Sequence, residues 1–121
     1  MQMHVDTESW AYRVPFRVSR GAESALDVVV VTLTDSHGHV GRGEAAGVDY
    51  DGETVPFMCA QIEAARPVIE RVAALDFASL ATLLPPGGAR NAVDCALWDL
   101  TAKQRRTTVW QLAGQIGRAH V

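Results

Sequence analysis

The hydrophobic pattern of this chain changes once along its length, from a strand pattern in the first 45 residues to a helix pattern in the rest. Because the expected strands all precede the expected helices, the order disfavours βαβ units and a parallel sheet. It is typical of an α+β domain. At 121 residues the chain is long enough for one such domain, whereas a complete (β/α)8 barrel needs roughly 200 residues or more.

Three segments of the N-terminal part are predicted to be strands. Residues 3–10 alternate apolar or small side chains with polar ones, residues 27–35 are rich in Val and Thr, and residues 39–45 follow a run of turn residues. Since each connection is short or looped, we expect a three-stranded antiparallel meander. Two stretches are predicted to be exposed loops carried by this sheet, at 16–25 and 46–52.

Apolar stripes at spacings of three and four predict a set of helices after the strands. The expected helices cover residues 55–72, 76–83, 89–104 and 109–113. Pro67 should kink the first helix or end its first half, because proline lacks an N–H donor and clashes with the preceding turn. Asp76 is placed to cap the second helix and Gly114 to end the last. Together these patterns predict a sheet followed by a helical bundle.

The composition excludes several classes of protein. The balance of 11 Lys and Arg against 14 Asp and Glu gives a net charge of −3, so we expect no nucleic-acid partner and no anionic membrane. The longest apolar run, 28–31, is too short to cross a bilayer, and the N-terminus lacks the order of a signal peptide. We therefore expect a cytoplasmic protein. Cys59 and Cys95 belong to no metal-binding pattern, which favours reduced, buried thiols.

Two motifs give only weak evidence for a nucleotide-binding site or a catalytic site. Gly41, Gly43 and Ala46 match a dinucleotide-binding fingerprint on paper. The glycines lie inside a predicted strand, however, so close packing of the backbone or a bulge explains them better. His37 and His39 flank a glycine in a predicted turn, and the sequence suggests no partner for acid–base chemistry at either ring.

Polar residues of the two loops are the remaining candidates for a site. Arg13, Arg17 and Arg20 cluster near the first loop and could bind a carboxylate, since guanidinium groups match carboxylate geometry. Asp49 and Asp51 in the second loop could act as an acid–base pair, although solvated loop side chains are the simpler interpretation. The residues themselves therefore indicate an α+β domain with two polar loops and no self-contained catalytic set.

A long motif covers residues 89–114. Its core has the pattern small-x-small-hydrophobic-Asp-x-Ala-x-x-Asp-x-x-Ala-Lys and ends at Lys103. This pattern resembles the signature at the end of the capping domain in the mandelate racemase/muconate lactonizing enzyme branch of the enolase superfamily. Gly-His-Val-Gly-Arg-Gly-Glu at 38–44 is also similar to that family. Pro-Phe-Arg-Val-Ser-Arg-Gly at 15–21, with Glu-Ser-Trp at 8–10, is most similar to dipeptide epimerases of the L-Ala-D/L-Glu type.

The resemblance covers residues 3–114 and implies a division of labour between two domains. In the family, an N-terminal α+β domain closes over the mouth of a C-terminal (β/α)8 barrel, and two of its loops contact the substrate. Those loops correspond to 16–25 and 46–52 of this chain. The resemblance thus implies that Arg20 contacts a substrate carboxylate. Weaker loop candidates for substrate binding are Arg17, Ser19, Val48 and Tyr50.

Family chemistry abstracts the proton α to a carboxylate and stabilises an enediolate on Mg²⁺. The barrel supplies the acid–base lysines and the metal carboxylates, so we expect no catalytic residue and no metal ligand in this chain. Its one lysine, Lys103, lies in the motif and is not the base. The resemblance therefore implies residues 1–114 as the capping domain of a Mg²⁺-dependent dipeptide epimerase. We expect the barrel as its partner, a small dipeptide as substrate, a homo-oligomeric parent, and an isolated chain that is inactive.

The C-terminal end departs from the family pattern. Residues 115–121 no longer resemble it, and 116–121 match one reading frame of a widely used sequencing adapter. The hypothesis is therefore a fragment of a longer gene with translated adapter at its end. Two alternatives stay open. One is the capping domain of a cycloisomerase or an o-succinylbenzoate synthase, and the other is a free-standing binding module that is not an enzyme.

Overall fold

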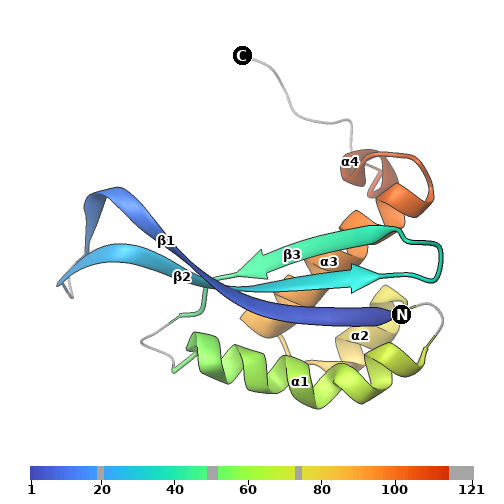
Figure 1. The fold of residues 1–121 in the computed structure, drawn as a ribbon, viewed down its shortest axis with the longest axis horizontal. Helices are drawn as coiled ribbons and strands as arrows, with labels where there is room; N and C mark the ends of the chain where they lie inside the picture. Colours follow the sequence, from blue (N-terminus) through green and yellow to red (C-terminus); the bar gives the residue numbers. More distant parts are fainter. Residues whose placement is uncertain (19–20, 49–51, 73–74, 115–121) are drawn as a thin grey trace.

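A three-stranded antiparallel sheet forms the first part of the fold (Figure 1). β1 (Gln2–Val18) pairs with β2 (Gly21–Thr34), and β2 pairs with β3 (Val40–Ala45), in the order β1-β2-β3. The computed structural model describes residues 1–18, 21–48, 52–72 and 75–114. The predicted meander and the α+β class are confirmed, and no barrel is present in the described chain.

The β1–β2 hairpin is much longer than the sequence predicts. Residues 16–25, expected as an exposed loop, are largely strand, and Arg17 of β1 pairs with Ala22 of β2. The register shifts between Ala11 and Phe16 of β1. Such an irregularity increases the local twist and bends the strand. The prediction of a long loop at this position is therefore wrong.

The outer part of the hairpin is a two-stranded ribbon that extends beyond the end of β3. β3 ends at Ala45, which pairs with Val29, so the residues of β2 that precede Val29 have only β1 beside them. Trp10 is 57% exposed and Val14 is 72% exposed. Alternation of apolar and polar residues is the signal by which a half-buried strand is predicted, and exposed apolar residues such as Trp10 and Val14 do not follow it.

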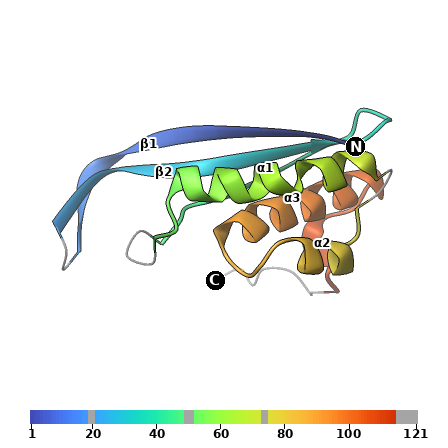
Figure 2. The ribbon, with the colours of Figure 1, turned by 90° about the horizontal axis from the view of Figure 1, so that it is seen from below.

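Helices form the second part of the fold, and α1, α2 and α3 lie on one face of the sheet (Figure 2). The elements are α1 (Val55–Arg71), α2 (Phe77–Leu83), α3 (Gly88–Gln104) and α4 (Val109–Leu112). Asp76 accepts a hydrogen bond from the backbone N–H of Ser79 at 2.6 Å, which confirms the predicted cap of α2. Gly114 follows α4 with a φ of 78°, as expected for the end of a helix.

Helix α1 continues through Pro67 to Arg71. Of the two outcomes expected at Pro67, a kink or an end to the first half of the helix, the second is therefore wrong. Proline removes one hydrogen bond from the helix, but buried side chains lie on both sides of it. Ala65 is 3% exposed and Ile69 is 0% exposed, so the apolar stripe packs against the core across the proline. Tertiary burial thus outweighs the local preference.

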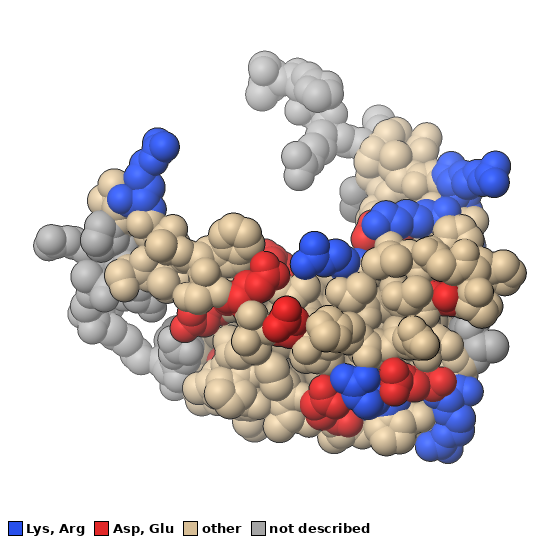
Figure 3. All heavy atoms as spheres, viewed as in Figure 1, with Lys and Arg blue, Asp and Glu red and all other residues tan. Residues whose placement is uncertain are grey.

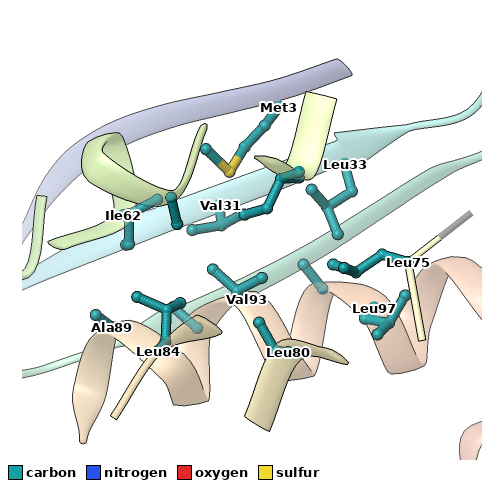
Figure 4. Packing of buried hydrophobic residues seen from close by; sticks show 14 of the residues in the cluster. Met3, Val31, Leu33, Ile62, Leu75, Leu80, Leu84, Ala89, Val93 and Leu97 are labelled. Atoms are coloured by element: carbon teal, nitrogen blue, oxygen red, sulfur yellow. The ribbon is translucent and has the colours of Figure 1, made fainter. Parts of the chain in front are cut away.

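The hydrophobic core lies between the helices and the face of the sheet that they cover (Figure 4). Val31 and Leu33 of β2 point into this layer, together with Ile62 of α1 and Val93 of α3, and all four are 0% exposed. Each fully buried aliphatic side chain stabilises the fold by about 1.5–3 kcal/mol. The core therefore ties both helices to the central strand.

The opposite face of the sheet is covered by charged side chains. Val28 and Val30 of β2 are 2% and 4% exposed although they alternate with the residues that face the helices. On this face Arg42 of β3 reaches Glu8 of β1 at 3.6 Å and bridges the two outer strands across β2. Figure 3 shows acidic side chains gathered over the sheet with a basic group beside them. Charged side chains on one face and helices on the other explain why the four consecutive valines at 28–31 are all buried.

Candidate functional site

The two segments expected to contact substrate lie at the same end of the sheet (Figure 1). Because the strands are antiparallel, the end of β1, the start of β2 and the end of β3 all meet this end. Figure 2, seen from another direction, shows the paired outer ends of β1 and β2 and the start of α1 on this side of the molecule. The sheet thus carries both candidate segments toward one side of the molecule.

The five predicted contact residues differ in how the structure places them. Arg17 belongs to β1, and for residues 15–18 and 21–23 only the backbone is described. Val48 lies in the β3–α1 connection and is 36% exposed. The other predicted contacts, and the two carboxylates of the second loop, lie outside the described residues: Ser19, Arg20, Tyr50, Asp49 and Asp51.

The stem of the β3–α1 connection is closed by backbone contacts. The N–H of Glu53 donates to the carbonyl oxygen of Val48 at 3.1 Å, and the N–H of Thr54 donates to that of Gly52 at 3.0 Å. Gly52 has a φ of 76°, which favours glycine. Gly47 lies so close to the carbonyl of Glu53 that no side chain would fit there. The described ends of the loop therefore have a fixed geometry.

The side chain of Glu53 caps the first turn of α3. Its Oε2 accepts a hydrogen bond from the N–H of Gly88 at 3.0 Å. The N-cap residue of α3 is Gly87, which has no side chain to accept such a bond. A carboxylate at a helix N-terminus also interacts favourably with the helix dipole. Sequence reasoning missed this role of Glu53. The available signal is a helix that begins at Gly-Gly without a capping residue of its own.

The glycines of β3 allow α3 to pack directly on the strand. A Cβ at Gly41 would collide with the backbone carbonyl of Ala96, and a Cβ at Gly43 would collide with that of Ala92. Close backbone packing therefore explains this Gly-x-Gly pair, as the sequence interpretation favours. The small residues of the long motif are the matching surface on the helix.

Two charged residues of the motif bind the outer edge of β3. The N–H of Arg42 donates to Oδ2 of Asp99 at 2.9 Å, and Nζ of Lys103 donates to the carbonyl oxygen of Val40 at 2.8 Å. Asp99 and Lys103, four residues apart on α3, also form an ion pair at 3.0 Å. An edge strand presents unpaired backbone groups, and these side chains satisfy two of them. Lys103 thus has a structural contact in this domain.

His39 has a partner that the sequence did not suggest. Its Nδ1 lies 2.8 Å from Oδ2 of Asp35, and the same carboxylate accepts hydrogen bonds from the backbone N–H groups of His37 and His39. The side-chain amide of Gln104 and these bonds hold the pKa of Asp35 well below its usual range. This group lies in the β2–β3 turn, at the end of the sheet opposite the candidate loops.

The prediction of two buried thiols is wrong for Cys95, and Cys59 is buried only in part. Cys59 is half-buried and Cys95 is exposed, and both are free. Cys95 falls beside the buried stripe of α3 rather than on it. Burial raises the pKa of both thiols, with further contributions from Glu63 and Asp94. A raised pKa disfavours the thiolate, so neither sulfur has the features of an activated nucleophile.

The described residues offer no metal centre and no membrane span. No three His, Cys, Asp or Glu side chains are grouped so that they could hold a metal ion within the described ranges. Magnesium therefore does not fit this part of the chain, and none of its described residues can be assigned as a ligand. None of the described helices is long and apolar enough to cross a membrane.

A three-stranded antiparallel meander backed by helices defines an enolase-type N-terminal domain. The chain belongs to the mandelate racemase/muconate lactonizing enzyme family, whose N-terminal domain matches residues 1–114. The resemblance stated from the motifs is thereby confirmed.

Two curated relatives are dipeptide epimerases. The L-Ala-D/L-Glu epimerase of Escherichia coli (strain K12) is 39% identical over 107 residues, which are 88% of this chain and 32% of that protein. The hydrophobic dipeptide epimerase of Roseobacter litoralis is 34% identical over 132 residues, covering 100% of this chain and 36% of that protein. The chain thus spans about a third of the length of each relative.

Solved structures give the same result. An enolase family member from Agrobacterium tumefaciens with homology to dipeptide epimerases, holding sodium and L-Ala-L-Glu, is 38% identical with a TM-score of 0.84. The match covers 93% of this chain and 34% of that one. A dipeptide epimerase from Methylococcus capsulatus, complexed with Mg and L-Arg-D-Lys, is 26% identical with a TM-score of 0.75 over 98% of this chain and 35% of that one.

Proposed function

We propose that residues 1–114 are the capping domain of a magnesium-dependent dipeptide epimerase, an isomerase that inverts the configuration at a carbon α to a carboxylate. The observation that supports this most directly is the similarity to the Agrobacterium structure that holds L-Ala-L-Glu, with 38% identity and a TM-score of 0.84. In this proposal the catalytic barrel lies beyond the cap in the parent protein, because the matched relatives are about three times as long.

The proposed role of the cap is to bind and orient the dipeptide rather than to move its proton. A barrel partner would hold the metal and the acid–base groups, since the described residues offer no metal site. The segments at 16–25 and 46–52 would cover the substrate and exclude water from it. The parent is proposed to be a homo-oligomer, and the isolated chain to be inactive. Residues 115–121 are proposed to be a non-family tail.

Arg20 is the proposed contact to a substrate carboxylate, because a guanidinium can form two parallel hydrogen bonds with it. Supporting contacts would come from Arg17, Ser19, Val48 and Tyr50. A hydrogen bond to a charged group contributes about 1.5–3 kcal/mol. Arg20→Ala in the parent enzyme should therefore lower kcat/KM for L-Ala-L-Glu by about 10- to 100-fold. The measurement is steady-state epimerisation followed by chiral chromatography.

The control for this variant is Arg71→Ala. This substitution also removes one positive charge, but Arg71 is the last residue of α1 and lies at the end of that helix away from the candidate segments. It should leave kcat/KM unchanged. A dipeptide with a neutral C-terminal residue should also be less affected by Arg20→Ala than L-Ala-L-Glu. An Arg20→Ala variant with unchanged kcat/KM for both the acidic and the neutral dipeptide would contradict the role of Arg20. Turnover of muconate or of the o-succinylbenzoate precursor in place of dipeptides would contradict the proposed substrate class.

A further inference from the structure

The carboxylate of Glu53 joins the β3–α1 connection to the helix layer. Glu53 immediately precedes Thr54, whose hydroxyl accepts a hydrogen bond from the N–H of Phe57 and caps α1. The Glu53 side chain reaches in the other direction and accepts the N–H of Gly88 at 3.0 Å. Two adjacent residues therefore cap two different helices, and the connection is attached to both.

The backbone of Glu53 attaches the other side of the same connection. Its N–H donates to the carbonyl oxygen of Val48 at 3.1 Å. Val48 is 36% exposed at the end of the sheet that carries both candidate segments. A displacement of Glu53 from α3 would therefore carry Val48 with it. Glu53 thus links Val48 to α3, because its backbone N–H bonds to Val48 and its side chain bonds to Gly88.

The surroundings of the carboxylate leave little room for another arrangement. A Cβ at Gly87 would meet Oε2 of Glu53, and a Cβ at Gly88 would crowd both Oε1 of Glu53 and the sulfur of Met58. Two successive glycines therefore give the carboxylate access to the first turn of α3. Since Gly87 supplies no cap of its own, the N–H of Gly88 depends on Glu53 for its partner.

We infer that Glu53 is a positioning residue, which holds Val48 at the substrate side of the domain by capping α3. The inference rests on the proposed function for its substrate, a dipeptide, and on the structure alone for its contacts. Glu53 itself need not touch the substrate. Its effect on binding would pass through the geometry of the connection that ends at Thr54.

The contacts are tested by amide hydrogen exchange on the 121-residue chain, with the variants Glu53→Ala and Glu53→Gln. Glu53→Ala should raise the exchange rates of the Gly88 amide and of the amide at position 53 by about tenfold or more, because a charge-assisted hydrogen bond is lost. Glu53→Gln retains an acceptor and should give a smaller increase. The amide of Val31 in the central strand should not change in either variant.

The matched control is Glu44→Gln, which removes one exposed carboxylate of β3 and leaves the helix caps intact. Its exchange rates at Gly88 and at Glu53 should equal those of the wild type. Unchanged exchange at Gly88 in Glu53→Ala would overturn the inference. Equal increases in Glu53→Ala and Glu44→Gln would overturn it as well, since a general loss of negative charge would then explain the effect.

The effect of Glu53 on substrate binding is tested in the parent enzyme. Glu53→Ala should raise the KM for L-Ala-L-Glu by about tenfold with a smaller change in kcat, and Glu53→Gln should restore part of the loss. A purely structural cap would lower the melting temperature without this separation of KM from kcat. An active wild type whose KM is unaffected by Glu53→Ala would overturn the inference. A wild type that does not epimerise dipeptides would instead overturn the proposed function, while the exchange result would still test the contacts.

Discussion

Asp35 joins the β2–β3 turn to the C-terminal part of α3 through both oxygens of its carboxylate. Oδ1 accepts the backbone N–H groups of His37 and His39, each at 2.9 Å, and Oδ2 accepts the side-chain amide of Gln104 at 2.9 Å. These bonds favour the ionised form and lower the pKa of Asp35. A single residue thus holds together two elements that are distant in the sequence.

The lowered pKa of Asp35 predicts how stability depends on pH. A carboxyl group whose pKa is lower in the folded state stabilises the fold above its unfolded pKa of about 3.9, and this contribution is lost as the pH falls below that value. Asp35→Asn should therefore be less stable than the wild type at pH 7, and the difference should narrow as the pH falls from 4 toward 2. The difference in the free energy of unfolding is measured at each pH by urea unfolding followed by circular dichroism.

Asp27→Asn is the matched control, because Asp27 is an exposed carboxylate of β2, the strand that ends one residue before Asp35. This variant should change stability little at pH 7. A difference between wild type and Asp35→Asn that stays constant from pH 7 to pH 2 would show that the charge of Asp35 is not the source of its effect.

Residue contacts of this kind divide into those that the sequence predicts and those that it cannot. The caps by Asp76 and the pair of Asp99 with Lys103 are local, so spacing alone predicts them. The bond from Glu53 to Gly88 joins positions 35 residues apart, and no local pattern records it. Arg20 was proposed from a family resemblance, and its side chain lies outside the described residues.

Among the elements, β3 and α3 form the closest contact outside the sheet. Gly43→Ala would place a Cβ against the backbone of Ala92 and Ala96 of α3, where no flexible side chain can move aside. Overpacking of this kind costs about 1–3 kcal/mol. We therefore predict that Gly43→Ala lowers the free energy of unfolding by this amount, measured by urea unfolding.

The control for this substitution is Glu44→Ala, because Glu44 is the next residue of β3 and is exposed. It should change the free energy of unfolding by less than about 0.5 kcal/mol. A Gly43→Ala variant as stable as the wild type would show that α3 does not pack directly against the strand.

The elements that the sequence predicts well are those with one buried face. The helices α2, α3 and α4 begin and end within one or two residues of the predicted positions, because their apolar stripes and caps are local signals. The ribbon formed by the outer parts of β1 and β2 was predicted as a loop. Its strands pair with each other beyond β3, and apolar residues such as Trp10 and Val14 are exposed there, so hydrophobic periodicity does not indicate a strand.

The whole molecule combines a rigid core with two segments at one end of a sheet. The cap from Glu53 attaches the β3–α1 connection at this end to α3, and the core between sheet and helices supports the sheet. Binding residues commonly lie on loops that a rigid scaffold positions. The architecture therefore suits a domain that orients a substrate, and the chemistry is assigned to the barrel of the proposed parent.

The central claim is that this chain caps a dipeptide epimerase and does not itself catalyse the reaction. The most direct test is exchange of the α-proton of L-Ala-L-Glu in D2O with Mg²⁺, followed by proton NMR. The parent enzyme with its barrel should wash out the Cα proton of the C-terminal residue, and the 121-residue chain alone should give no exchange above the enzyme-free rate. Exchange by the isolated chain, or none by a folded parent, would contradict the account.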